Sequence, residues 1–137
     1  MKKMKKKKSF RKYNFDSNPS LKAVTYGLMV SYMVTLVFFL LFALLLTYTS
    51  FSDRYIPIFT LAITYVGVFL AGFFSAKSIG TKGWLHGSVA GFLYIFVMFL
   101  LSYVFIPGFS ISTVYFVKAI IGLLLGAVGG ILGINFR

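Results

Sequence analysis

Four long apolar runs, separated by short polar turns, occupy most of the chain. They cover about residues 21–48, 56–76, 84–106 and 112–134, and each reaches the roughly 20 apolar residues that a membrane-spanning helix needs. A backbone inside hydrocarbon must satisfy its own hydrogen bonds, so each run is predicted to be an α-helix. The expected fold is therefore all-α, an integral membrane protein with four transmembrane helices arranged as two hairpins.

Composition agrees with lipid as the solvent. The chain is 59% hydrophobic and 12% charged, whereas soluble domains are about 45–50% apolar and about 25% charged. We expect a basic tail at residues 1–20, followed by a four-helix transmembrane domain at residues 21–137.

The basic residues are distributed unevenly. Eight of the fourteen Lys and Arg residues lie within residues 1–12, and Lys77 and Lys82 lie in the central turn. Because Lys and Arg hold flanking segments in the cytoplasm, both termini and the central turn are predicted to be cytoplasmic in a multi-pass plasma-membrane protein. The tail is interpreted as a topogenic signal, and binding to anionic lipid is a compatible second role. Contact with nucleic acid is the least favoured of the three interpretations.

The segment Ser75–Gly91 is expected to form the tight turn between the two hairpins. It combines Lys82, Trp84 and His86 with four glycines. The Lys-Ser/Thr pair of a phosphate-binding loop is missing, so the glycines instead predict positive φ angles and close helix contacts. A single histidine without cysteine or carboxylate neighbours favours capping of the turn over a role as metal ligand or proton relay.

Small residues recur at steps of three and four in the second and fourth runs, so each set lies on one helical face. Lipid does not drive helices together by the hydrophobic effect, and small residues instead let two backbones approach closely. We expect the second and fourth helices to pack on each other through these faces, with the third helix adding a contact. Packing across a dimer axis is the alternative. The predicted packing residues are Gly67, Ala71, Ser75, Gly87, Gly91, Gly122, Gly126, Gly129, Gly130 and Gly133.

The two hairpins align with each other when Gly67 is matched to Gly122 and Ala71 to Gly126. This alignment predicts a parallel internal repeat about an axis along the membrane normal. Chance matching of two apolar sequences is the alternative explanation.

Lys118 lies on the glycine face of the fourth run, about two turns from its outer end. A cation that faces a helix bundle inside a membrane is a functional hypothesis by default. The alternative is that its side chain reaches the outer headgroups, near Asp53. The candidate functional polar residues are Lys118, His86, Trp84 and Lys82.

The titratable residues argue against catalysis. No Asp or Glu lies inside any apolar run, and the chain has no cysteine and one histidine. General acid–base catalysis needs positioned titratable groups, and His86 with the remote Asp16 and Asp53 provides no such pair. The sequence therefore predicts no catalytic residue, no metal-ligand set, no cofactor and no enzymatic activity.

The motif KGWLHG at Lys82–Gly87, with a Gly- and Ala-bearing helix before it and a Gly-ending helix after it, resembles the YrzE-like family. That family comprises small, uncharacterised four-helix membrane proteins of Gram-positive bacteria. The resemblance covers roughly Leu21–Gly133. It implies a bacterial plasma-membrane location and four spans, and it supplies no activity, substrate or catalytic residue.

Two functions follow as hypotheses. The first is a non-enzymatic scaffold or accessory subunit that binds a membrane-protein partner or a second copy of itself. The second is a small homo-oligomeric channel or transporter, in which Lys118 and a stripe of hydroxyls line an anion-tolerant path. The two hypotheses differ in where Thr60, Thr64 and Lys118 lie. If these side chains are occluded within one chain, the scaffold is favoured. If they line a water-filled gap at an oligomer axis, the channel is favoured.

Overall fold

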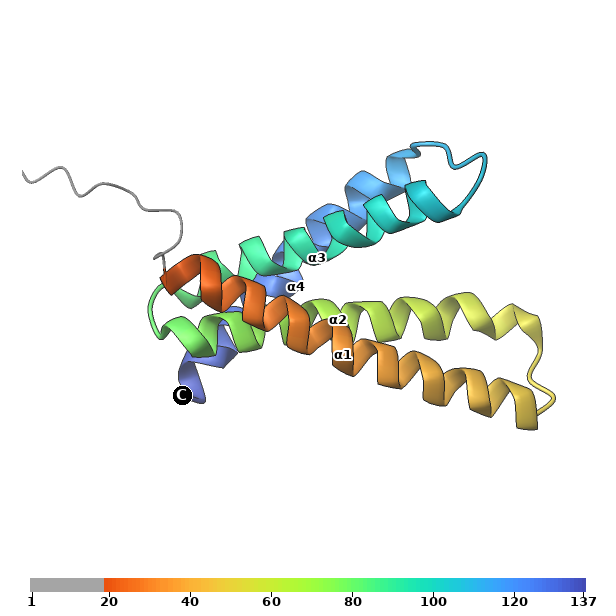
Figure 1. The fold of residues 1–137 in the computed structure, drawn as a ribbon, viewed down its shortest axis with the longest axis horizontal. Helices are drawn as coiled ribbons and strands as arrows, with labels where there is room; N and C mark the ends of the chain where they lie inside the picture. Colours follow the sequence, from red (N-terminus) through yellow and green to blue (C-terminus); the bar gives the residue numbers. More distant parts are fainter. Residues whose placement is uncertain (1–18) are drawn as a thin grey trace, which may run out of the picture.

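The computed structural model describes residues 19–137, and this part of the chain consists of four long helices (Figure 1). Residues 1–18 of the predicted basic tail lie outside the described residues. The prediction of an all-helical chain with four helices long and apolar enough to cross a membrane is confirmed for residues 19–137. The helices are α1 (Pro19–Tyr48), α2 (Ile56–Ile79), α3 (Gly83–Phe105) and α4 (Thr113–Asn135), with a short 3-10 helix, η2 (Asp53–Tyr55), before α2.

The turn between α2 and α3 is shorter than the segment Ser75–Gly91 that we expected. Gly80 adopts a left-handed conformation (φ 72°), and its N–H donates to the carbonyl of Ala76 at 2.9 Å, which ends α2. Lys82 is also left-handed (φ 46°) and directly precedes α3. Two left-handed residues within three positions reverse the chain at once, so the flanking residues on both sides remain helical.

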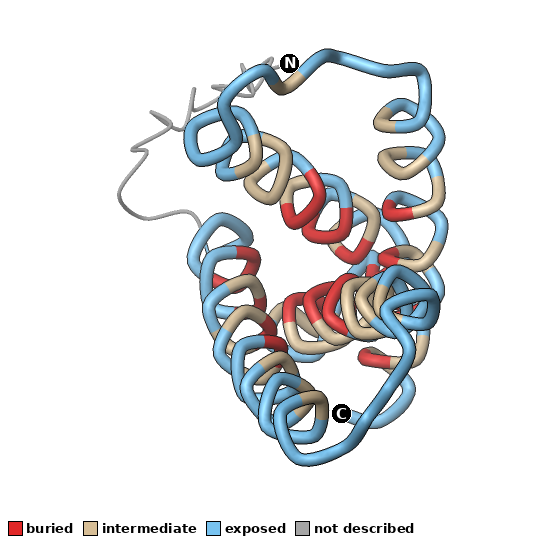
Figure 2. The backbone as a smooth tube through the Cα atoms, turned by 90° about the vertical axis from the view of Figure 1, so that its right-hand side faces the viewer, coloured by how far each residue is buried: buried red, intermediate tan, exposed pale blue. Residues whose placement is uncertain are grey.

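The four helices form two hairpins, α1 with α2 and α3 with α4 (Figure 1). The hairpins meet at the end that carries the turn of residues 80–82, here called the turn end. They diverge toward the end that carries residues 49–55 and 106–112, here called the loop end; Figure 2 shows the same divergence from that end. Helix α2 is the central element, because it packs extensively against α1, α3 and α4, whereas α3 contacts α1 only slightly.

Burial follows this divergence. Residues 36–48, 56–66, 96–105 and 113–121 form the loop-end halves of the helices, and none of them is buried. Every buried residue of the four helices therefore lies in a turn-end half (Figure 2). The apolar core is correspondingly small, and its buried members are Val24, Val68, Ala71, Ala90, Tyr94 and Ile95.

Candidate functional site

Helices α3 and α4 meet through two antiparallel rows of glycines, here called the glycine ladder. A Cβ atom added at Gly87 or Gly91 would lie within 3.0 Å of the α4 backbone, and one added at Gly126 would lie equally close to α3. Both rows advance in steps of four residues, so successive glycines face the partner helix. The ladder residues are Gly83, Gly87 and Gly91 in α3, with Gly122, Gly126 and Gly130 in α4.

A second face of α4 packs on α2. Added Cβ atoms at Gly129 and Gly133 would lie within 3.0 Å of the carbonyl groups of Phe69 and Phe73. The α2 side of this contact also includes Gly72, whose added Cβ would meet the backbone of Gly126. Helices α2 and α4 are therefore in contact as expected, but through a different face of α2 than the one predicted.

The predicted face of α2 instead contacts α1 and α3. Ser75 lies against Gly27 of α1, and Gly67 lies against Thr35 of α1 and Tyr94 of α3. Ala71 is fully buried in the core. The expected pairing of the α2 and α4 stripes was wrong because the two hairpins cross, which turns the small residues of α2 toward α1 and α3 and leaves Gly72 and the Phe69 and Phe73 backbone facing α4.

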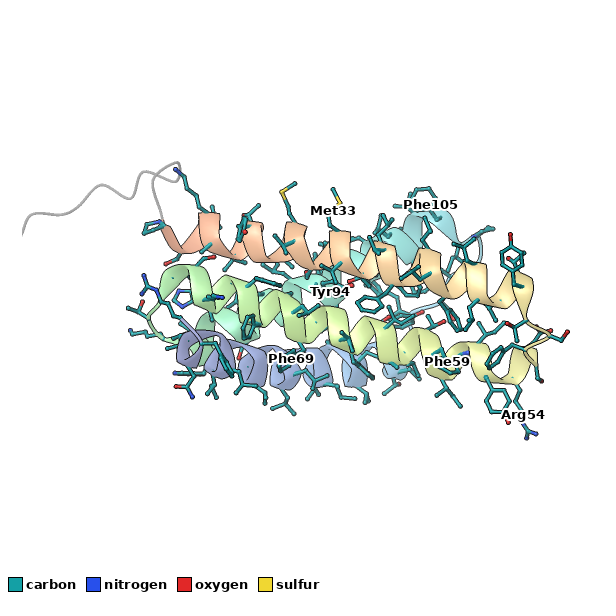
Figure 3. The ribbon with its side chains drawn as sticks, turned by 90° about the horizontal axis from the view of Figure 1, so that it is seen from below. Met33, Arg54, Phe59, Phe69, Tyr94 and Phe105 are labelled. Carbon is teal, nitrogen blue, oxygen red and sulfur yellow. The ribbon has the colours of Figure 1, made fainter. Side chains whose placement is uncertain are left out.

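A largely buried polar cluster, here called the tyrosine node, joins α1 directly to α3 beside Gly67 of α2. The hydroxyl of Tyr94 donates to Thr35 Oγ1 at 2.9 Å, and the hydroxyl of Tyr32 donates to the carbonyl of Tyr94 at 2.8 Å. The two tyrosine rings stack with centroids 4.4 Å apart. Thr35 Oγ1 in turn donates to the carbonyl of Ser31. In the view of Figure 3, Tyr94 lies about midway along the helices, between the ribbons of α1 and α2.

Sequence reasoning did not identify the tyrosine node. Gly67 makes room for it, because an added Cβ would lie 2.6 Å from Thr35 Oγ1 and close to the Tyr94 hydroxyl. One sequence signal was available: Tyr32 and Thr35 share a face of α1, three residues apart, in the interior of a predicted span. Polar side chains inside a span usually hydrogen-bond to another helix. The identity of that partner depends on the packing.

The side chain of Lys118 is half-buried, and its ammonium lies 5.3 Å from the centroid of the Tyr115 ring. Tyr115 precedes Lys118 by about one turn, so the lysine side chain is directed toward the loop end of α4. Asp53, the one acidic residue among residues 19–137, lies in η2 of the other hairpin. A cation–π contact of this kind contributes about 0.5–1 kcal/mol when it is exposed.

The three other candidate polar residues lie at the turn end. The imidazole Nδ1 of His86 lies 3.1 Å from the carbonyl oxygen of Thr81 and 3.0 Å from that of Lys82. Two carbonyl acceptors require Nδ1 to carry the proton, so His86 caps the turn as a donor. Trp84 is exposed, and Lys82 is the exposed residue immediately before α3. Within residues 19–137, no three His, Cys, Asp or Glu side chains lie close enough together to hold a metal ion.

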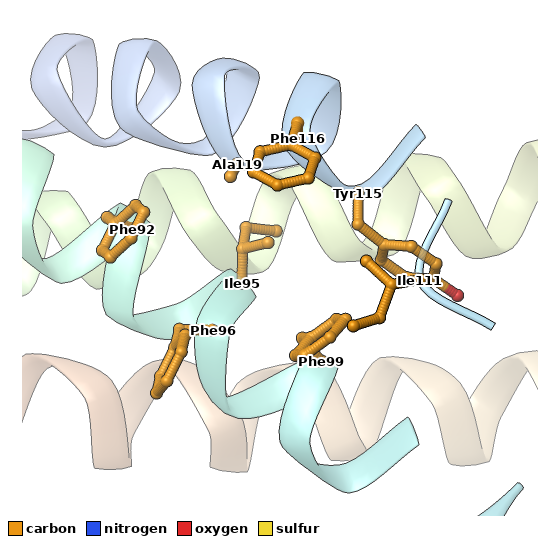
Figure 4. Close-up of a pocket in the computed structure, with 8 residues that line it drawn as sticks. All are labelled: Phe92, Ile95, Phe96, Phe99, Ile111, Tyr115, Phe116 and Ala119. Atoms are coloured by element: carbon orange, nitrogen blue, oxygen red, sulfur yellow. The ribbon is translucent and has the colours of Figure 1, made fainter. Parts of the chain in front are cut away.

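An apolar pocket of about 260 Å³ lies between α3 and α4, toward the loop end (Figure 4). The hydroxyl of Tyr115 is the polar side-chain group among its lining residues, so the pocket suits hydrocarbon and has no titratable acid–base pair. The lining residues are Phe92, Ile95, Phe96, Phe99, Ile111, Tyr115, Phe116 and Ala119.

Comparisons with known proteins agree with this architecture. A family described as protein of unknown function (DUF3792) matches residues 20–133, which is most of the chain. The chain belongs to the DUF3792 family. It is also similar to the uncharacterized membrane protein YrzE of Bacillus subtilis (strain 168), with 28% identity over 117 residues that make up 85% of this chain and 77% of that relative. No solved structure matches the chain.

The resemblance to a YrzE-like membrane family is thereby confirmed. The four apolar helices and this relative together identify a multi-pass membrane protein. The matched region of residues 20–133 contains the glycine ladder and the tyrosine node, so both lie within the part of the chain that defines the family.

Proposed function

We propose that this protein is a non-enzymatic scaffold or accessory subunit of the bacterial plasma membrane. In this role the turn-end halves of the helices form a rigid base, and the loop-end halves offer apolar helix faces to another transmembrane segment. The partner is either a different membrane protein or a second copy of this chain.

The unequal packing of the two halves carries the proposal. The turn-end halves hold every buried residue of the four helices and meet through glycine backbones. The loop-end halves bury none, although they are more apolar than the turn-end halves. A membrane protein that acted alone would gain stability from packing along the full length of its helices. Divergence over half of that length leaves contact surface for a partner.

The alternative, a small homo-oligomeric channel or transporter, has weaker support. The hydroxyls of Thr60 and Thr64 donate to the carbonyls of Ile56 and Thr60 at 2.8 Å, so their protons are used within α2. The ammonium of Lys118 lies against Tyr115. These side chains do not present a row of free hydrogen-bond donors, which an anion path would need.

The orientation forms part of the proposal. Lys77 and Lys82 at the turn end, together with the basic residues of the N-terminal tail, favour a cytoplasmic location for both termini under the positive-inside rule. The tail then lies against anionic lipid of the inner leaflet. We retain the parallel internal repeat as a proposal, since the buried residues of both hairpins lie in their turn-end halves.

Site-specific photo-crosslinking in the native membrane tests the proposed role. A photoreactive amino acid replaces Leu44 or Val104, two exposed loop-end residues, or the exposed turn-end residue Ile131 as the matched control. We expect a discrete protein adduct from the loop-end positions and none from Ile131. The mass of the intact complex, released in a gentle detergent, then distinguishes a different protein from a second copy.

Two outcomes would contradict the scaffold proposal. Equal labelling at Leu44, Val104 and Ile131, with lipid as the sole adduct, would show that lipid covers both halves. A pure symmetric homo-oligomer that conducts anions in liposomes, and loses conductance when Lys118 becomes leucine, would establish the channel instead.

A further inference from the structure

The turn end gathers basic side chains from all four helices. Lys22 lies in the first turn of α1, Lys77 in the last turn of α2, Lys82 directly before α3 and Arg137 after α4. Among residues 19–137 the one acidic side chain, Asp53, belongs to the loop end. No acidic side chain of the described chain therefore neutralises this surface.

Arg137 is placed directly on the α2–α3 turn. Gly80 lies so close to its guanidinium that an added Cβ would overlap Nη1 and Cζ of Arg137. The guanidinium of Arg137 thus lies against Gly80, which is two residues before Lys82 in the same turn. Lys77 differs from this pair, since its ammonium already lies 5.7 Å from the centroid of the Phe73 ring.

The chemistry of this pair suits a phosphate group. A guanidinium offers several N–H donors in a planar fork that matches phosphate oxygens, and an ammonium adds a compact charge. His86 Nδ1 lies within hydrogen-bond distance of the carbonyl oxygens of Thr81 and Lys82, which braces the turn that carries the lysine. Both Lys82 and Arg137 are exposed, so their charged groups are open to a ligand.

We propose that Arg137 and Lys82 together bind the phosphate of an anionic phospholipid headgroup across the α2–α3 turn. The turn end is one end of four membrane-spanning helices, which puts this pair at the level of the headgroups. Trp84, exposed and two residues from Lys82, suits the same interfacial depth. This inference goes beyond the accessory role, because it concerns a lipid and requires no protein partner.

The experiment measures binding of phosphatidylglycerol, with zwitterionic phosphatidylcholine as the reference of zero net charge, to the full chain in mild detergent by native mass spectrometry. The test variant combines Lys82→Asn with Arg137→Gln, since asparagine tolerates the left-handed backbone of residue 82. The matched control combines Arg54→Gln with Lys118→Gln, which removes the same charge toward the loop end, where Figure 3 shows Arg54. The basic N-terminal tail is retained in both and contributes equally.

We expect the turn-end variant to lose at least about tenfold in affinity for phosphatidylglycerol, as the loss of two surface cations implies. The control is expected to bind as the parent does. An equal loss in both variants, or no loss in either, overturns the proposal. Complete competition by millimolar inorganic phosphate also overturns it, because the site would then recognise free phosphate. If the double variant unfolds, Arg137→Lys serves instead, and it must weaken binding because it keeps the charge without the fork.

Discussion

Gly87 of α3 and Gly126 of α4 meet backbone to backbone, and each leaves no room for a Cβ atom on the other. An alanine at either position would place its methyl group within 3.0 Å of the opposite helix. This contact lies in the middle of the glycine ladder and fixes the closest approach of the two helices of the second hairpin.

Gly126→Leu is therefore expected to destabilise the protein. Overpacking of a well-packed core typically costs about 1–3 kcal/mol, and we expect a loss of at least this size. A Cβ at Gly126 would lie against the backbone of Gly87 and Gly91, so a leucine side chain there must push α4 away from α3. Thermal unfolding in a mild detergent measures the loss. Ala43→Leu is the control, because Ala43 is exposed on α1 and the added side chain faces lipid. Equal melting temperatures for the two variants would refute the role of the ladder.

The tyrosine node predicts coupling between α1 and α3. Tyr94→Phe and Thr35→Val each remove one side of the 2.9 Å hydrogen bond between these residues. A double-mutant cycle is expected to give a coupling free energy of about 0.6 kcal/mol, the average for interhelical hydrogen bonds in a membrane protein. Thr60→Val replaces Thr35→Val in the control cycle, since Thr60 hydrogen-bonds within its own helix. Strict additivity for Tyr94 and Thr35 would contradict the node.

Gly67 provides a further test of the same cluster. Gly67→Ala is expected to destabilise the fold, because the new methyl group would overlap the Tyr94 hydroxyl. Tyr94→Phe removes that hydroxyl, so the combination Gly67→Ala with Tyr94→Phe is expected to recover part of the lost stability. The rescue stays partial, as Thr35 Oγ1 and the ring Cζ of residue 94 would still lie 2.6 and 2.9 Å from the methyl group. A combination less stable than either single variant would show that the clash lies elsewhere.

The turn end allows the cost of a left-handed backbone to be separated from the cost of displacing a side chain. Gly80 and Gly108 have similar φ angles of 72° and 79°, but Arg137 covers Gly80 whereas nothing lies within 4 Å of the site of a Cβ at Gly108. Alanine at either position costs about 1–2 kcal/mol for the left-handed conformation. We expect Gly80→Ala to cost more than Gly108→Ala in thermal unfolding, and Arg137→Ala to remove the difference.

Lys118→Leu is expected to leave membrane insertion and the thermal stability of the isolated chain within about 1 kcal/mol of the parent, the scale of an exposed cation–π contact. The ammonium contacts the Tyr115 ring, and the acidic residue of the described chain belongs to the other hairpin. Quantification of the inserted protein and its melting temperature test this. A collapse of the isolated chain would mean that Lys118 stabilises the bundle from within.

Much of the architecture was determined by the sequence alone. Four apolar runs of more than 20 residues admit only helices, since a lipid-exposed backbone must satisfy its own hydrogen bonds. The ends of those helices were also largely predictable, because residues such as Pro57 and Gly80 have positional preferences that act locally. The glycines at steps of four in α3 and α4 similarly predicted close helix packing, because such packing depends on side-chain size and helical periodicity.

The tertiary structure alone decided which faces meet. The crossing of the hairpins turned Gly67 toward Tyr94 and left Gly72 to face α4, although both glycines carry the same local signal. It also created the tyrosine node from Thr35 and Tyr94, which are 59 residues apart, and it left the loop-end halves unburied. The physical reason is that helix formation depends on hydrogen bonds and sizes within one segment. The angle between two helices depends on the sum of contacts that many segments make at once.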